Sequence, residues 1–194
     1  MVEKFDPQCS ESTHEYAATV LIEVAVTAFQ LMNAGQEESL VFGQLSHLAN
    51  ITKLAELVLS KPNSSAVIYG APVLVELVQG FKARGVDDRK SSELPPVYQV
   101  LEASLGKLKE HLETPNDHQV STTTGPLAPP FGLARVQVLE LLKALAESQF
   151  TSLLDSLLKE KLFVTGFVRC SSRTSLLPLS DPSLTGSLLL VPLE

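Results

Sequence analysis

The sequence predicts an all-α fold, an armadillo- or HEAT-like α-solenoid built of antiparallel helix pairs. Apolar residues recur at the three- and four-residue spacing of a helix in one segment after another. These segments are roughly 10–20 residues long, and short stretches rich in glycine, proline and polar residues separate them. No strict letter repeat accompanies the pattern, so the solenoid prediction rests on periodicity and loop spacing.

The clearest unit of the pattern covers residues 121–145, where a loop rich in helix breakers leads into an amphipathic helix. Gly125, Pro126 and two further prolines predict irregular chain before Phe131. Arg135 is the only charge in the first turn and a half of the helix that follows. Apolar residues then keep helical spacing, at Val136, Val138, Leu139, Leu141, Leu142, Leu145 and Ala146.

The other segments predict a series of similar helices, with residues 114–130 as a long connecting loop. Breaks in the pattern place these helices at about 13–33, 37–48, 51–60, 66–83, 94–112 and 150–161. Ser10 and its neighbours offer N-caps for the first of them, and Asn50 caps the third. Pro72 removes a backbone donor, so a kink or break is expected near residues 69–71.

Inward-facing residues are also predicted for the two helices with the shortest apolar patterns. The helix at 37–48 is expected to turn Leu40, Val41, Leu45 and Leu48 inward. The helix at 150–161 is expected to turn Leu153, Leu154, Leu157 and Leu158 inward.

The sequence divides into two parts at Leu162. Residues 1–161 predict a helical-repeat domain that is part of a longer array, because the chain starts with what resembles the end of a helix. Residues 162–194 contain many serines, leucines and prolines, and no helical period holds there for more than a turn. They predict a low-order tail that is not homologous to the rest of the array, such as the product of alternative splicing.

The charge of the chain is acidic and unevenly placed. The net charge is −7 over 194 residues. The first fifty residues contain Lys4 as their only base and seven acids, Glu3, Asp6, Glu11, Glu15, Glu23, Glu37 and Glu38. This balance argues against nucleic acid as a partner, since phosphates require a basic face. It leaves a solvated acidic edge or an acidic docking face for a basic partner.

Cysteine content and the N-terminal sequence predict a location in the cytoplasm, with the nucleus as a second compartment. Cys9 and Cys170 are far apart in terminal segments, as expected for reduced thiols rather than a disulfide. The first residues contain no basic segment followed by an apolar one, so no signal peptide is expected. No apolar run reaches the ~18 residues that cross a bilayer, so no membrane association is predicted.

The sequence offers no catalytic, cofactor-binding or metal-binding constellation, and we expect no enzymatic activity. His14, His47, His111 and His118 lie on separate segments without paired metal-ligand spacing. The doublets Glu37-Glu38 and Asp87-Asp88 are typical of solvated surface. The candidate nucleophiles Ser148, Ser171 and Ser172 have no base in view.

Several ordered patterns resemble the SAPS domain, which is found in regulatory subunits of serine/threonine protein phosphatase 6. They are Val73-Leu74-Val75-Glu76-Leu77-Val78, Thr122-Thr123-Thr124-Gly125, Pro129-Pro130-x-Gly132-x-x-Arg135 and Val138-Leu139-x-Leu141-Leu142. The resemblance covers about residues 1–160. The chain departs from the family pattern at Leu133, where asparagine is usual, and at Gln137, where histidine is frequent.

The resemblance implies a non-catalytic regulatory or scaffold subunit. Such a chain would bind the catalytic subunit of phosphatase 6, and further scaffold subunits, and would direct substrate choice or location. The resemblance assigns no contact residues, so the partner-binding residues stay unknown. The alternative is a generic armadillo-like adaptor between proteins, without a phosphatase link. An enzyme would need a pocket with converging titratable groups.

Overall fold

The computed structural model describes residues 1–36, 40–83, 94–114, 120–122, 125–127, 132–162 and 164. The described elements are η1 (Val2–Phe5), α1 (Glu11–Asn33), α2 (Leu40–Ser46), α3 (Leu48–Val58), α4 (Ser65–Ala83), α5 (Pro96–Ala103), α6 (Leu105–Glu113), β1 (Val120–Thr122), β2 (Gly125–Leu127), α7 (Leu133–Glu147) and α8 (Thr151–Lys159). Apart from one short hairpin the described chain is helical, which confirms the all-α class.

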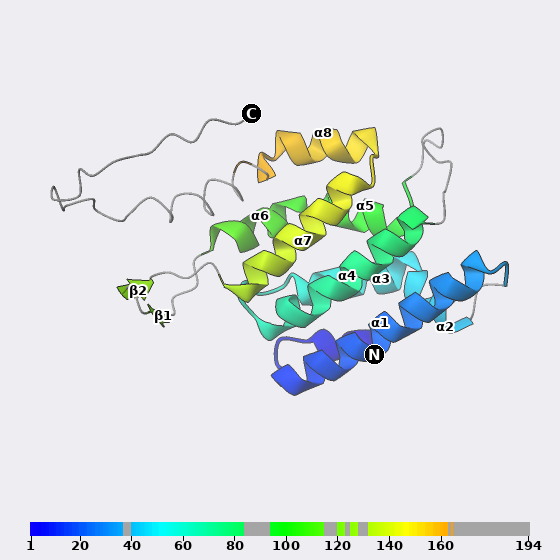
Figure 1. Ribbon diagram of the computed structural model, residues 1–194, viewed down its shortest axis with the longest axis horizontal. Coiled ribbons are helices and arrows are strands. Elements are labelled where there is room, and N and C mark those ends of the chain that lie inside the picture. The colour runs from blue at the N-terminus through cyan, green and yellow to red at the C-terminus, as the bar shows by residue number, and fades with distance from the viewer. Residues whose placement is uncertain are drawn as a thin grey trace, which may run out of the picture.

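Three long helices form one layer of the molecule. Helices α1, α4 and α7 lie side by side and run in the same direction (Figure 1). A second layer contains α3, α5 and α6, and α8 packs against α5 and α7. Helices α3 and α4 contact each other, as expected for two consecutive helices of a predicted helix pair. The repeating solenoid itself stays a prediction.

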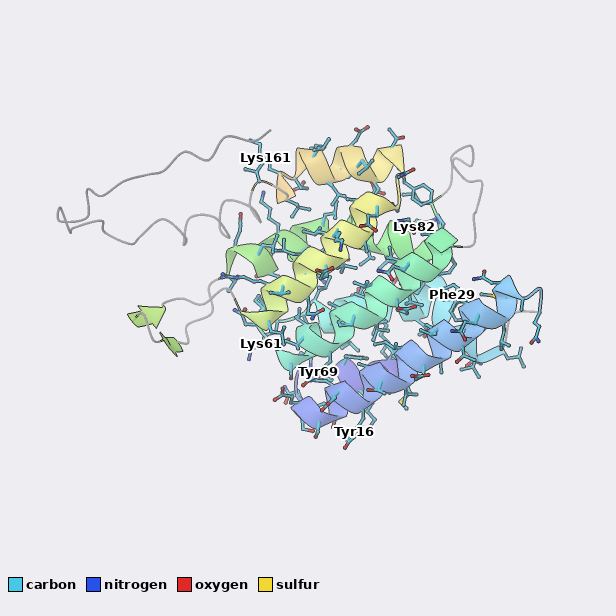
Figure 2. All side chains as sticks on the ribbon, viewed as in Figure 1. Tyr16, Phe29, Lys61, Tyr69, Lys82 and Lys161 are labelled. Atoms are coloured by element: carbon cyan, nitrogen blue, oxygen red, sulfur yellow. The ribbon has the colours of Figure 1, made fainter. Side chains whose placement is uncertain are left out.

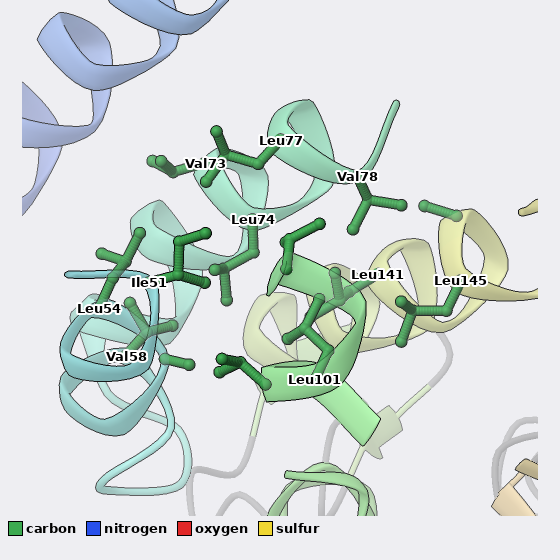
Figure 3. Packing of buried hydrophobic residues seen from close by; sticks show 14 of the residues in the cluster. Ile51, Leu54, Val58, Val73, Leu74, Leu77, Val78, Leu101, Leu141 and Leu145 are labelled. Carbon is green, nitrogen blue, oxygen red and sulfur yellow. The ribbon is translucent and has the colours of Figure 1, made fainter. Parts of the chain in front are cut away.

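The core lies where the two layers meet. Side chains from α3, α4, α5 and α7 converge there, including Leu54, Leu74, Leu101 and Leu141 (Figure 3). All four are fully buried. Because the apolar stripe of each helix repeats every three or four residues, each contributes one continuous face to this interior.

Helix α4 approaches its neighbours closely at two glycines. A Cβ atom added to Gly80 would overlap the ring of Phe29 on α1, and one added to Gly70 would overlap Val58 on α3. The ring of Phe29 also packs edge-on against Phe42 and Phe81, with centroids 4.8 and 5.6 Å away. Gly80 therefore lets α4 approach α1 within its own layer, and Gly70 lets it approach α3 of the second layer.

Most helix ends lie close to their predicted positions. The Ser10 Oγ accepts a hydrogen bond from the Thr13 N–H at 3.3 Å, which caps α1 as expected. Gly35 follows the end of α1 with φ +79°, a conformation that favours glycine. The cap of α3 differs from the prediction. His47 is the N-cap, and Asn50 lies inside the helix, where its Nδ2 donates to the Gln44 carbonyl at 2.6 Å.

A kink or break was expected near residues 69–71. The helix does not break there, because α4 continues through Pro72. A proline costs the helix one hydrogen bond. On either side of it, Ala71, Val73 and Leu74 are completely buried between α1, α3 and α7. Tertiary packing on several sides of α4 therefore outweighs the local preference for a break.

The predicted helix at 94–112 is instead two helices, α5 and α6, which meet at Ser104. The Ser104 Oγ donates to the Val100 carbonyl at 2.8 Å. A serine side chain that bonds back to the preceding turn competes with the helix for that carbonyl. Gly106 follows two residues later and weakens helix continuation further.

The loop predicted at 114–130 contains regular structure. Strands β1 and β2 pair antiparallel, with Val120 opposite Leu127 and Thr122 opposite Gly125. The expectation of irregular chain before Phe131 is therefore wrong for residues 125–127. A two-stranded hairpin has two outer edges, and proline is tolerated where its missing N–H faces outward.

Four residues predicted to face inward are exposed. Leu40, Val41 and Leu48 are 88%, 62% and 46% exposed, and Leu158 is 65% exposed. The helices are shorter than expected, so a single i, i+3 or i, i+4 pair makes each buried face. That pair is Phe42 with Leu45 in α2 and Leu153 with Leu157 in α8.

Most of the predicted tail lies outside the described residues, as do Glu37, Glu38, Asp87 and Asp88. Leu162, where the tail was predicted to begin, is fully buried in the core. One expectation about membranes changes. By length and composition α1 could cross a membrane. It packs against α4, and its buried residues, Phe29 among them, belong to the core.

Candidate partner-binding site

Histidines and serines of the described chain serve structural roles. The His14 ring lies within 2.8 Å of Ser65 Oγ and 3.0 Å of the Asp6 carbonyl, so it joins α1 to the start of α4. The Ser148 hydroxyl donates to the Leu145 carbonyl at 2.6 Å and closes the end of α7. Over the described ranges, no group of three or more His, Cys, Asp or Glu side chains could hold a metal ion. His118, Ser171 and Ser172 lie outside those ranges.

The buried guanidinium of Arg135 fixes the two ends of the segment between α6 and α7. Arg135 is 1% exposed, and its Nε donates to the Thr114 carbonyl at 3.1 Å. Its Nη2 donates to the same oxygen. A buried charge is costly unless it is hydrogen-bonded, so the position of this side chain is strongly specified. The end of α6 and the start of α7 are thereby joined.

In the sequence, Arg135 was noticed as an isolated charge and as part of the family motif that starts at Pro129, and its anchoring role was missed. A signal was present in its spacing. Val138, Leu142 and Leu145 follow it at three, seven and ten residues, so Arg135 lies on the buried face of α7. A charge on such a face requires polar partners inside the protein. Gly132 precedes the helix with φ +79° and lets the chain turn into it.

Two further buried polar groups join neighbouring helices of the core. The Tyr98 hydroxyl donates to the Val78 carbonyl at 2.9 Å, and burial raises the pKa of Tyr98 to about 12. The His111 Nε2 lies 3.2 Å from the Leu59 carbonyl at the end of α3. Burial lowers the pKa of His111, because the charged ring would lose its hydration. Its Nδ1 is buried without a hydrogen-bond partner in the described structure.

Two grooves between described helices are large enough to receive side chains of a partner. The first, the N-terminal groove, lies between η1, α1, α2 and α3 and has a volume of about 340 Å³. Its lining includes Val20 and Val24 of α1, Val41 of α2, and Glu3 and Lys53 at its edge. The second, the α3–α5 groove, has a similar volume, about 340 Å³, and runs from Leu48 and Glu56 to Gln99 and Lys107.

Electrostatics in the N-terminal groove centre on one ion pair. The Lys53 Nζ lies 2.6 Å from Glu3 Oε1, although both side chains are largely exposed. The hydrogen bond from Lys53 and its charge lower the pKa of Glu3. This pair bridges η1 and α3 along one side of the groove. Neither groove brings together the converging acids, bases and nucleophiles of an active site.

The structure is thus an all-α module whose helices are joined by buried hydrogen bonds. Grooves on its surface could receive a partner. A family comparison is more specific. Residues 1–164 match the SAPS family, described as SIT4 phosphatase-associated protein. The match covers most of the chain, so the chain belongs to this phosphatase-associated regulatory family, as the motifs from Thr122 to Arg135 predicted. No curated protein and no solved structure matches the chain significantly.

Proposed function

We propose that the chain is a non-catalytic regulatory subunit that binds the catalytic subunit of a serine/threonine phosphatase of the phosphatase 6 type. It would direct the substrate choice or location of that enzyme, in the cytoplasm and also in the nucleus. The observation that carries the proposal is the family match over residues 1–164, since the family is phosphatase-associated. The resemblance of the motifs around Thr122 and Arg135 supports the finer assignment to phosphatase 6.

The β1–β2 hairpin is the contact element that we propose for the catalytic subunit. It projects from one end of the helical layers (Figure 1). The described residues that flank the segment containing it, Thr114 and Arg135, are hydrogen-bonded to each other. Joining the two ends of a connecting segment reduces the conformational freedom that it loses when a partner binds.

Binding to purified catalytic subunits tests the proposal. The full chain is immobilised, and the phosphatase 6 catalytic subunit is compared with catalytic subunits of other serine/threonine phosphatases. Selective capture of the phosphatase 6 subunit is expected. Dephosphorylation of a phosphopeptide should come from the captured subunit, and the chain alone should show none. If no catalytic subunit binds a folded chain, a generic helical adaptor becomes the better reading.

Two variants locate the contact. Replacing residues 120–127 by a glycine–serine linker of equal length removes the hairpin and leaves the helices in place. The matched control is Lys143→Ala on α7, whose side chain is 66% exposed and is paired with its helical neighbour Glu140. Loss of capture with the linker variant and retention with the control support the hairpin. Equal capture by both moves the contact to another surface.

A further inference from the structure

The outer side of α1 carries an apolar stripe that the described elements leave largely exposed, although its Val24 is half-buried and packs against the core. Tyr16, Val20, Val24 and Leu31 recur at helical spacing along it, and Val41 of α2 adjoins it across the N-terminal groove. Tyr16 is 72% exposed, Val20 41% and Val41 62%. Tyr16 lies on the side of α1 away from α4 (Figure 2). We call these five residues the open face of α1.

The length and shape of the open face suit a helix. From Tyr16 to Leu31 the stripe spans about 22 Å, at 1.5 Å per residue. Within the same layer, α4 packs against a long parallel helix on each side, α1 and α7. Helix α1 has such a neighbour on one side only. A hydrophobic stripe beside a groove is the surface into which amphipathic helices dock, and contiguous exposed apolar area of this kind marks interaction sites.

The charge around the open face selects the partner. Helix α1 carries Glu11, Glu15 and Glu23 and no lysine or arginine. Its last turn also has no basic residue, so the negative end of the helix dipole is not offset there. The lysine that lines the adjoining groove, Lys53, is paired with Glu3. Lys4 on η1 and the N-terminal ammonium of Met1, which lines the groove, are further cations at this end of the chain, against the three acids of α1.

We propose that the open face of α1 docks an amphipathic helix of a partner protein in which lysine or arginine flanks an apolar stripe. The apolar stripe would cover Tyr16, Val20 and Val41, and the basic side chains would reach Glu15 and Glu23. A second copy of the chain would bring the same acidic helix, which like-charge repulsion opposes. The proposal is independent of the phosphatase assignment, because it uses no residue of the hairpin and concerns the α1 edge of the helical layers, opposite α8 (Figure 1).

Designed peptides test the proposal with the full chain. The probe is a fluorescent amphipathic helix of about five turns, with leucine on one face and lysine on the rest. A second peptide replaces every lysine by glutamate, and a third scrambles the basic sequence so that no apolar stripe forms. Fluorescence anisotropy is expected to show saturable binding of the first peptide alone. Its affinity should fall with salt, because Debye screening weakens exposed charge pairs.

Variants separate the apolar and the charged contributions. Val20→Asp should weaken binding about tenfold or more, because a carboxylate would be buried under the leucines. Glu15→Lys with Glu23→Lys should weaken binding at low salt and much less at high salt. The matched control is Leu158→Asp on α8, an exposed leucine at the far end of the array, which should bind like wild type. Thermal melts followed by circular dichroism establish that each variant is folded.

Three results would overturn the proposal. Equal binding of the acidic peptide would show that charge does not select the partner, and binding of the scrambled peptide would show that no helical stripe is read. Failure of the basic peptide to bind a folded chain would remove the docking face. Light scattering on the same samples tests whether a second copy of the chain binds the open face instead. A mass that doubles with concentration in wild type and not in Val20→Asp would assign the face to a second copy.

Discussion

Helices α1 and α4 are both long and strongly apolar, and they differ in what surrounds them. Helix α4 has α1 on one side and α7 on the other, and α3 lies beneath it. Its residues Val73, Leu74, Leu77 and Val78 are fully buried. Helix α1 has a partner in its own layer on one side only, and Tyr16, Val20 and Leu31 stay exposed. Of these two long apolar helices, α4 is therefore enclosed in the core, whereas α1 keeps the exposed face that we propose as a docking surface.

The largest expected effect comes from removing side-chain volume from α4. Leu74→Ala should lower the free energy of unfolding by about 2–5 kcal/mol, since it loses buried apolar area and leaves a cavity. Val20→Ala on α1 should change it by about 0.5 kcal/mol or less, because part of that side chain is already in water. Urea denaturation of both variants measures the difference. Equal losses would mean that α1 is as buried as α4.

The close contact between α1 and α4 can be tested by adding a side chain at Gly80. Gly80→Ala would place a methyl group in the ring of Phe29 and should cost about 1–3 kcal/mol through overpacking. Gly106→Ala is the matched control, because nothing lies within 4 Å of its added Cβ in α6. There the lower backbone entropy of alanine should stabilise the helix by about 0.5–1 kcal/mol. Thermal unfolding should therefore shift in opposite directions, and a parallel shift would contradict the close approach.

The same contrast explains how far the sequence could predict the fold. The long helices follow directly from periodicity, and the ends of α1 follow from Ser10 and Gly35. Periodicity reports which residues are apolar, and it cannot report which side of a helix has a neighbour. The exposed Leu40, Val41 and Leu158 were therefore predicted to be buried. The continuous helix through Pro72 was missed for the same reason, since its support comes from other helices.

The candidate site was less predictable than the fold. The family motifs identified the segment before α7, but the role of Arg135 depends on the Thr114 carbonyl, which is distant in sequence. The open face of α1 could be recognised only from the exposed fractions of its side chains and from the neighbouring groove, which the sequence does not give. The uneven acidic charge of the first fifty residues was visible in the sequence, and it allowed either a solvated acidic edge or a docking face for a basic partner.

Two buried histidines, one in α1 and one in α6, differ in their hydrogen bonds, and the difference can be tested by changing the pH. In α1, the two ring nitrogens of His14 meet Ser65 and the Asp6 carbonyl, whereas His111 in α6 has a partner for Nε2 alone. The pKa of His111 is lowered in the folded protein, so below about pH 6.5 the unfolded state binds the proton first. The stability that His111 contributes is present above that pH and is lost as the pH falls.

The measurement is the free energy of unfolding of wild type and His111→Leu across mildly acidic pH. Wild type should lose stability more steeply than the variant as the pH falls below the histidine range. The leucine variant lacks the proton-binding group, so its curve reports the other titrations alone. Identical slopes would mean that His111 is hydrated in the folded state, contrary to its 2% exposure.

The smallest effect is expected at the surface, where α4 meets its other neighbour. The Lys82 Nζ lies 3.3 Å from Glu147 Oε2 of α7, and both side chains are almost half exposed (Figure 2). Lys82→Ala should cost about 1 kcal/mol or less, because such pairs are solvated and screened by salt. Denaturation at low salt and at 1 M salt, where the Debye length is about 3 Å, measures the screened part. A loss that persists at high salt would assign the effect to packing of the lysine stem on α7, so that α4 would depend on apolar contact even at its charged edge.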